Sequence, residues 1–208
     1  QFIVAGIVLI VVILVVQSLS GNSQRQADEA LAQYYLAGQL YDMGMETLRY
    51  GDIETAVGQL QGAEQIASNN YSTYPGRDSG RKSALLAAKI RIMFGMNSEV
   101  IADLQDFLAA DPGQDLRNSA NLHLAIALEN RGSANDLEIA QQLYNEILEN
   151  TTEDSQLAWE AYSGISRILY TLEDYEESQE YFDLALEISQ DTTDFVSYQL
   201  TRFEMAMN

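Results

Sequence analysis

Side chains that commonly carry out catalysis are scarce in this chain of 208 residues. Its single histidine, His123, lacks the second histidine and the glutamate of an HExxH zinc motif. The absence of cysteine excludes disulfides, cysteine-based zinc sites and thiol nucleophiles. The sequence also has no GxxxxGK[ST] phosphate loop and no GxSxG elbow. We therefore expect no catalytic residues, no metal and no cofactor, and we interpret His123 as an ordinary helix residue.

The charged residues are mostly acidic, with 31 Asp and Glu, 11 Lys and Arg, and a formal net charge of −20. Contacts with the phosphates of nucleic acids need clustered Lys and Arg, so we expect no nucleic-acid partner. The acidic cluster around Glu173 and Glu177 does not have the spacing of a calcium loop. Its position at a predicted helix start favours the helix dipole and solvent instead.

The few basic residues are more informative, because Arg77, Arg81, Lys82, Lys89 and Arg91 lie close together in the sequence. Lys82 and Lys89 are the only lysines, and their spacing of seven places them on one face of a predicted helix. This arrangement predicts a surface that binds acidic groups of a partner. The alternative is that both lysines form ordinary ion pairs with neighbouring acidic helices.

Before the helices that carry these residues, the chain begins with an apolar segment. Residues 2–16 form a run of fifteen residues without a polar side chain, and a membrane-spanning helix needs roughly 20 apolar residues. We predict that residues 1–20 form a transmembrane anchor helix. One alternative is a signal peptide cleaved near Ser18-Leu19-Ser20. The other is the N-terminal helix of a pilin-like filament subunit, a family that it resembles loosely, since Ala5 and Gly6 stand where an acidic residue is typical.

The flank that follows the apolar segment predicts an orientation. Arg25 is its only basic residue, whereas cytoplasmic flanks of membrane helices usually carry an excess of Lys and Arg. We therefore expect the remainder of the chain in the periplasm or elsewhere outside the cytoplasm, with the anchor in the inner (cytoplasmic) membrane.

A helix–turn–helix pattern of about 34 residues spans residues 159–192, and similar spacings recur at 37–70, 81–114 and 118–153. In the last unit we predict one helix at 157–171 and a second at 175–189, with Ser166 and Ser178 allowing close approach. Gly51-Asp52 forms the turn of the first unit. In the third unit, Ser133-Ala134-Asn135 lengthens the turn that begins at Gly132.

These units resemble the tetratricopeptide repeat (TPR) family over most of residues 37–192. The resemblance implies an all-α fold, in which an α-solenoid of about four TPR-like helix pairs follows the N-terminal transmembrane helix. Residues 21–36 would be a connecting helix or linker with a break near Gly21, and residues 193–208 a capping helix. The unit at 81–114 departs most from the pattern, since Arg91 stands where an aromatic residue or leucine is usual.

In proteins with this repeat, certain positions of the first helix line a concave groove. By motif alignment these positions hold Tyr41, Met45 and Arg49 in the first unit, Lys82, Leu85 and Lys89 in the second, Leu122 and Ile126 in the third, and Arg167 and Tyr170 in the fourth. We predict partner-binding roles for Tyr41, Arg49, Lys82, Leu85, Lys89, Arg167 and Tyr170. The resemblance thus implies a mixed apolar and basic groove that receives an acidic segment.

The sequence supports two further predictions, one about a loop and one about glycosylation. Residues 69–80, between the first two units, read as a long surface loop around Pro75-Gly76, and the alternative is a partner-contact loop carrying Tyr71 and Tyr74. Asn70-Tyr71-Ser72 and Asn150-Thr151-Thr152 are glycosylation sequons, which have meaning only in a eukaryotic secretory route.

The layout of one span followed by a TPR-like domain resembles the ancillary, chaperone-associated subunit of the bacterial secretion translocon. It implies a scaffold or assembly subunit of a membrane protein complex, with integral membrane or exported proteins as partners and the membrane contacted through residues 1–20. The alternative function is a structural subunit of a surface filament.

Overall fold

The computed structural model describes residues 2–152 and 155–189, and within them the chain forms eight helices and no strand. The prediction of an all-helical, repeat-like chain is confirmed. The chain divides into two compact units, Gln1–Ile90 and Arg91–Asn208. The boundary falls inside the unit predicted at 81–114, next to Arg91. The predicted capping helix at 193–208 lies outside the described residues.

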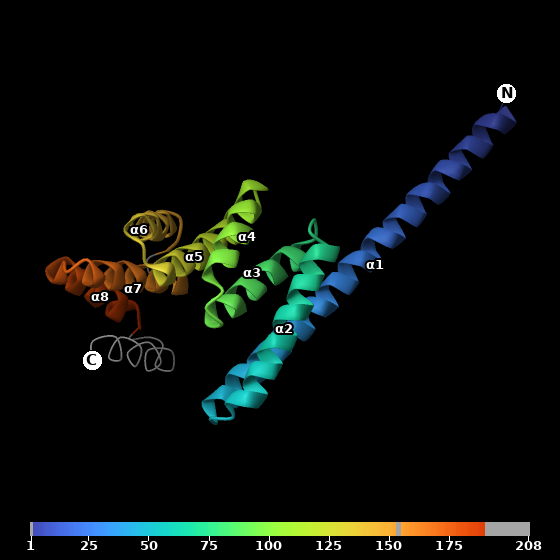
Figure 1. Ribbon diagram of the computed structural model, residues 1–208. Coiled ribbons are helices and arrows are strands. Elements are labelled where there is room, and N and C mark those ends of the chain that lie inside the picture. The colour runs from blue at the N-terminus through green and yellow to red at the C-terminus, as the bar shows by residue number, and fades with distance from the viewer. Residues whose placement is uncertain (1, 153–154, 190–208) are drawn as a thin grey trace. The chain divides into compact units, whose positions relative to one another are not determined.

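The first unit is built from α1 (Phe2–Arg49), α2 (Ile53–Thr73) and most of α3 (Asp78–Met93). Helix α2 folds back along the second half of α1, and the first half of α1 extends beyond the end of α2 (Figure 1). Gly51 and Asp52 make the turn as predicted: Gly51 has φ of +82°, and the Asp52 side chain accepts a hydrogen bond of 3.1 Å from the amide of Thr55.

Small residues let α1 and α2 pack closely. Ala37 of α1 and Ala56, Ala63 and Ala67 of α2 are fully buried. A Cβ added to Gly44 of α1 would lie 2.8 Å from Leu60 Cγ, which is closer than real Cβ atoms come. The helical spacing of these alanines places them on the faces where α1 and α2 meet, and there they form the core of this unit.

The second unit contains α4 (Asn97–Ala109), α5 (Gln114–Arg131), α6 (Ala134–Glu149), α7 (Gln156–Thr171) and α8 (Tyr175–Ser189). Helix α5 contacts α4, α6 and α7, and α7 also contacts α6 and α8 (Figure 1). Aliphatic side chains and the fully buried Tyr144 fill the space between these helices, with Leu104, Ile147, Ile165 and Ile168 as the largest aliphatic contributors.

The last predicted repeat is confirmed closely, because α7 and α8 begin and end within one residue of the predicted helices. Ser166 and Ser178 are both buried, and each hydroxyl donates a 2.8 Å hydrogen bond to the other residue's carbonyl oxygen. A larger side chain at either position would separate the helices, so these serines fix the distance between α7 and α8.

The lengthened turn predicted after Gly132 is wrong. Helix α5 ends at Arg131 and α6 begins at Ala134, so only Gly132 and Ser133 lie between the helices. Gly132 adopts the left-handed conformation, with φ of +74°, and the Ser133 hydroxyl accepts a 3.2 Å bond from the amide of Asp136. The extra residues extend α6 because serine is an effective N-cap.

The predicted transmembrane anchor is corrected by the structure. Throughout the described part of the chain, no helix has both the length and the apolar character needed to cross a membrane. Residues 1–20 also do not form a helix of their own, because α1 continues without a break from Phe2 to Arg49. The fifteen-residue apolar run would cover about 22 Å as a helix, against a hydrocarbon core of about 30 Å.

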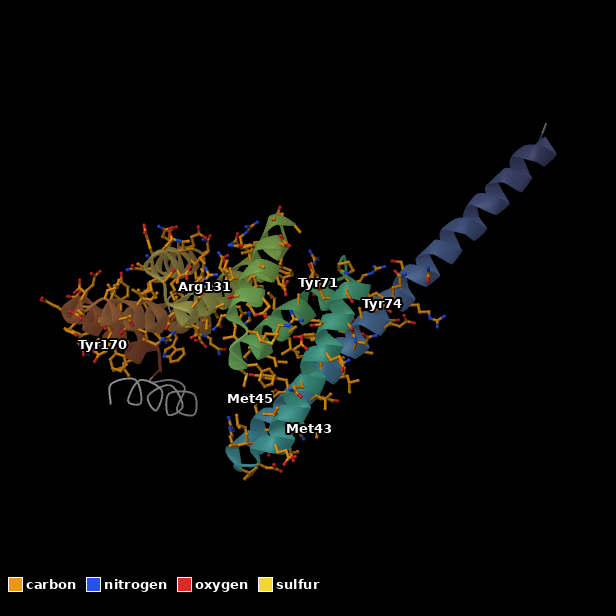
Figure 2. The ribbon with its side chains drawn as sticks, in the orientation of Figure 1. Met43, Met45, Tyr71, Tyr74, Arg131 and Tyr170 are labelled. Atoms are coloured by element: carbon orange, nitrogen blue, oxygen red, sulfur yellow. The ribbon has the colours of Figure 1, made fainter. Side chains whose placement is uncertain are left out.

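Asp136, at the start of α6, should make the stability of the turn between α5 and α6 depend on pH. Hydrogen bonds from Arg131 and Ser133 lower the pKa of Asp136 well below its ordinary value, and the Arg131 bonds measure 2.6 and 2.8 Å. Figure 2 labels Arg131 at the end of α5. A lowered pKa stabilises the fold above the unfolded-state pKa, and this contribution disappears as pH falls through the folded value.

We expect D136N to weaken the dependence of unfolding on pH below about 4, where aspartate titrates in unfolded chains. Urea unfolding followed by the fluorescence of Trp159, the only tryptophan, measures this between pH 2 and pH 6. D106N, at the exposed Asp106 of α4, is the matched control. An unchanged pH profile in D136N would contradict the assignment.

Candidate functional site

In the first unit, α1 and α3 present a surface that we call the tyrosine–lysine face, formed by Tyr34, Tyr35, Tyr41, Lys82 and Lys89. Lys82 lies near Tyr34 and Tyr35, and Lys89 lies on Tyr41, seven residues further along each helix. The two helices therefore run in the same direction along this face. The structure thus brings the predicted binding residues Lys82 and Lys89 of α3 together with Tyr41 of α1.

Lys89 is one of the two exposed cations of the face. Its ammonium nitrogen lies 4.8 Å from the centroid of the Tyr41 ring, within the range of a cation–π interaction. Among the described residues it has no carboxylate partner, so the contact holds the side chain in place while leaving its charge without a counter-ion. Within the described part of the chain, the alternative of an ordinary ion pair is therefore not observed for Lys89.

Lys82 differs, because Asp78 lies one turn earlier on the same helix and forms an ion pair of 2.8 Å with it. The hydrogen bond and charge of Asp78 raise the pKa of Lys82 above its ordinary value, with smaller contributions from Tyr34 and Tyr35. Both partners of this pair are about half exposed, 47% for Lys82 and 61% for Asp78. An exposed pair of this kind contributes little stability, so a partner's carboxylate can compete for Lys82.

Helix α3 is covered on most of its circumference. Between residues 81 and 90, Lys82 and Lys89 are the exposed residues, while Ser83, Leu85, Ala87, Ala88 and Ile90 are buried. The two lysines therefore mark a narrow exposed line along α3. Leu85, predicted to contact a partner, is only 7% exposed and belongs to the core instead.

A buried asparagine holds α3 against the helix pair. The fully buried Asn70 of α2 donates hydrogen bonds of 2.9 Å to the carbonyl oxygen of Ala30 in α1 and 2.8 Å to Ser83 Oγ in α3. Ala37, Ala67 and Ala87, one from each helix, form a small apolar cluster. This node fixes the distance between the tyrosines of α1 and the lysines of α3.

The segment at 69–80 is mostly helical, contrary to the prediction of a long loop. Helix α2 continues to Thr73 and α3 begins at Asp78, so the connection is residues 74–77. Tyr74 donates a 2.8 Å hydrogen bond to Glu29, and Arg77 donates to Ser23 and Gln26 in α1. Tyr74 therefore lies against α1, as Figure 2 shows, and contacts its own chain.

The other predicted α1 positions lie near the end of that helix. Arg49 is exposed, and Met45 is partly buried. Met43, two residues before Met45, is 52% exposed and leaves α1 on another side of the helix, as labelled in Figure 2.

The predicted positions in α5 and α7 belong to the second unit and do not form a cationic surface. Arg167 makes hydrogen bonds of 2.6 and 2.9 Å to both oxygens of Glu129 in α5. Tyr144 of α6 donates a third bond, of 2.8 Å, to the same carboxylate. Burial alone would lower the pKa of Arg167, but the charge and hydrogen bonds of Glu129 outweigh it and raise the value. The positive charge of Arg167 is therefore balanced by the carboxylate of Glu129 within the second unit.

The remaining residues of interest are buried or partly buried within the second unit. Leu122 is buried and Ile126 partly buried, while Tyr170 packs edge-on against Tyr175 with ring centroids 5.3 Å apart. His123 is also partly buried, and no group of three or more metal-ligating side chains occurs within the described ranges.

Sequence reasoning missed Tyr34 and Tyr35 as members of the face. The available signal was the spacing of seven between Tyr34 and Tyr41, which matches the spacing of Lys82 and Lys89. The cluster of Glu129, Tyr144 and Arg167 gave no such signal, because its members lie far apart in sequence.

Comparison of the chain with protein-family models and with curated proteins finds no match. The tyrosine–lysine face therefore has to be interpreted from its own chemistry.

Proposed function

We propose that this chain is a TPR-like scaffold whose tyrosine–lysine face binds an acidic segment of a partner protein. Lys89 carries the proposal, because this exposed cation is held on the Tyr41 ring without a carboxylate partner in the described chain. In a protein with 31 acidic residues and 11 basic ones, a lysine without a counter-ion is unexpected unless it has another use.

The tyrosines add the apolar part of the site. Tyr35 is 63% exposed and Tyr41 is partly buried beneath Lys89. Tyrosine supplies a large contact area with little loss of side-chain entropy, and it is enriched among the residues that dominate binding energy at interfaces. A segment with carboxylates beside apolar side chains therefore complements the face better than a purely acidic one.

The net charge of −20 makes the site selective. Polyanions such as nucleic acids are repelled by the whole chain at distances comparable to the Debye length, which is about 8–10 Å near physiological salt. Only a segment that places its carboxylates against the two lysines gains enough local attraction to offset that repulsion. The charge of the chain therefore favours a protein partner of limited acidity.

The cellular setting stays a prediction. A role as an accessory or assembly subunit of a protein complex outside the cytoplasm, and the alternative role of a filament subunit, both come from the sequence. Neither is needed for the proposed binding, and we propose no catalytic role for any residue of the chain.

Charge reversal at both lysines is the direct test. We expect a random peptide library displayed on phage and selected on the unsubstituted protein to become enriched in Asp and Glu. For the most enriched peptide, K82E/K89E should lower the affinity measured by fluorescence anisotropy at least about tenfold, because like charges then face each other at the interface.

The matched control is R25E/R117E, which changes the net charge equally at two exposed ion pairs that do not include Lys82 or Lys89. This variant should lose much less affinity than K82E/K89E. No acidic enrichment, or equal affinities for the lysine variant and the unsubstituted protein, would contradict the proposed function.

A further inference from the structure

The tyrosine–lysine face repeats its own chemistry along its length. Tyr34 and Tyr41 are separated by seven residues on α1, and Lys82 and Lys89 by seven on α3. Seven residues are almost two full helical turns, so each repeat lies about 10.5 Å further along the face and in nearly the same direction. The surface therefore carries a tyrosine and a lysine at each of two positions along its length. Lys89 lies over the Tyr41 ring, and Lys82 is ion-paired with Asp78.

This repeat restricts the conformation of the bound segment, an inference that rests on the proposed function. In an extended strand, residues on one face are about 6.8 or 13.6 Å apart, and neither distance matches 10.5 Å. On a helix, residues seven apart lie on one face at the matching distance. We propose that the ligand of this face is an amphipathic helix with carboxylates seven residues apart and apolar residues beside them.

The two positions are not equivalent. Lys89 lies over the Tyr41 ring and has no carboxylate partner in the part of the chain that the structure describes, so it accepts a ligand carboxylate without losing an existing pair. Lys82 must exchange the carboxylate of Asp78, 2.8 Å away, for that of the ligand. Lys89 is therefore the stronger anchor, and Asp78 reduces the affinity of the second position.

Three synthetic peptides separate this inference from its alternatives. Each is an alanine–glutamine host helix of about 20 residues, long enough to be helical in water, with the same leucines and two glutamates. The first peptide has its glutamates seven residues apart. The second has them five apart, which places them on different faces of the helix. The third keeps the spacing of seven but has a proline between them to break the helix.

We expect the first peptide to bind the full chain at least about fivefold more tightly than either of the others in fluorescence anisotropy. K89E should abolish this preference, and R25E should preserve it. D78N should increase the affinity of the first peptide about twofold, in keeping with the small contribution of an exposed ion pair. Circular dichroism of each variant checks that the fold is retained.

Equal binding of the first two peptides, or undiminished binding of the proline peptide, would overturn the helical inference. If the phage selection yields acidic peptides that depend on Lys82 and Lys89 and the first peptide shows no preference, the proposed function stands and this inference fails. If the selection shows no acidic enrichment, both fail.

Discussion

Replacing Arg167 with methionine should lower the free energy of unfolding of the second unit by about 3–5 kcal/mol, the range for breaking a buried ion pair. Arg167 is 26% exposed and Glu129 16% exposed, so most of the pair is removed from water. In R167M, the carboxylate of Glu129 loses two hydrogen bonds and its counter-charge, and Tyr144 becomes its remaining partner in the cluster. The expected loss of stability therefore comes from the buried charge of Glu129, which has lost its counter-ion.

Urea denaturation followed by Trp159 fluorescence measures this change, because Trp159 lies in α7, is 7% exposed and reports on the unit that contains Arg167. A signal confined to one unit is needed, since a chain of two units need not unfold in a single step. The matched control is R117M, which breaks the more exposed pair with Asp111 and should cost less than about 1 kcal/mol.

The double variant R167M/E129L decides whether the loss comes from the stranded charge. Replacing both members of a buried pair with apolar residues is often neutral or stabilising, so R167M/E129L should recover part of the stability lost in R167M. The recovery is incomplete because E129L also removes the hydrogen-bond partner of the buried Tyr144 hydroxyl. A loss below about 1 kcal/mol in R167M would mean that this carboxylate is solvated in the folded protein. No recovery in the double variant would mean that lost contacts of the Arg167 side chain, and not a stranded charge, cause the loss.

Replacing Gly164 with alanine should be comparably damaging, with an expected loss of about 3 kcal/mol, at the upper end for overpacked cores. Gly164 lies in the middle of α7, where a Cβ would overlap three atoms of the Tyr144 ring. The ring cannot move aside easily, because Tyr144 is fully buried and its hydroxyl is bonded to Glu129. The same Trp159 measurement gives the change in stability.

The control for G164A is G58A, in α2 of the first unit, where an added Cβ meets nothing within 4 Å. Its unfolding is followed by circular dichroism, because Trp159 lies in the second unit. Since alanine favours helices over glycine by about 1 kcal/mol, G58A should leave the protein unchanged or slightly more stable. In the background of Y144L, which removes the distal ring atoms, G164A should cost much less. An equal cost in both backgrounds would show that the ring contact is not the cause.

The sequence predicts well those features that depend on local spacing. The bounds of α7 and α8 follow from apolar residues at helical intervals and from Ser166 and Ser178, whose small size signals close packing. Gly51-Asp52 gives the first turn because a glycine and a capping aspartate act locally. Lys82 and Lys89 lie on one exposed line of α3 because residues seven apart on a helix point in nearly the same direction.

Features set by partners distant in sequence could not be predicted in this way. Leu85 occupies a groove position by alignment with the repeat motif, yet packing around most of α3 buries it. Arg167 is neutralised by Glu129, 38 residues earlier in the chain, and only the packing of α5 against α7 brings them together. Gly164 is different, since a glycine inside a helical pattern is costly and could have indicated a close contact.

The burial of Asn70 has a consequence for producing this protein. Asn70 begins the sequon Asn70-Tyr71-Ser72, and its amide nitrogen donates to both Ala30 and Ser83 in the folded chain. In a eukaryotic secretory host, a sugar attached to that nitrogen before folding would remove one of its two hydrogens and occupy the space where α3 docks. Asn150, the other sequon asparagine, is exposed and would tolerate a glycan. A host without N-glycosylation is therefore the expression system compatible with an intact tyrosine–lysine face.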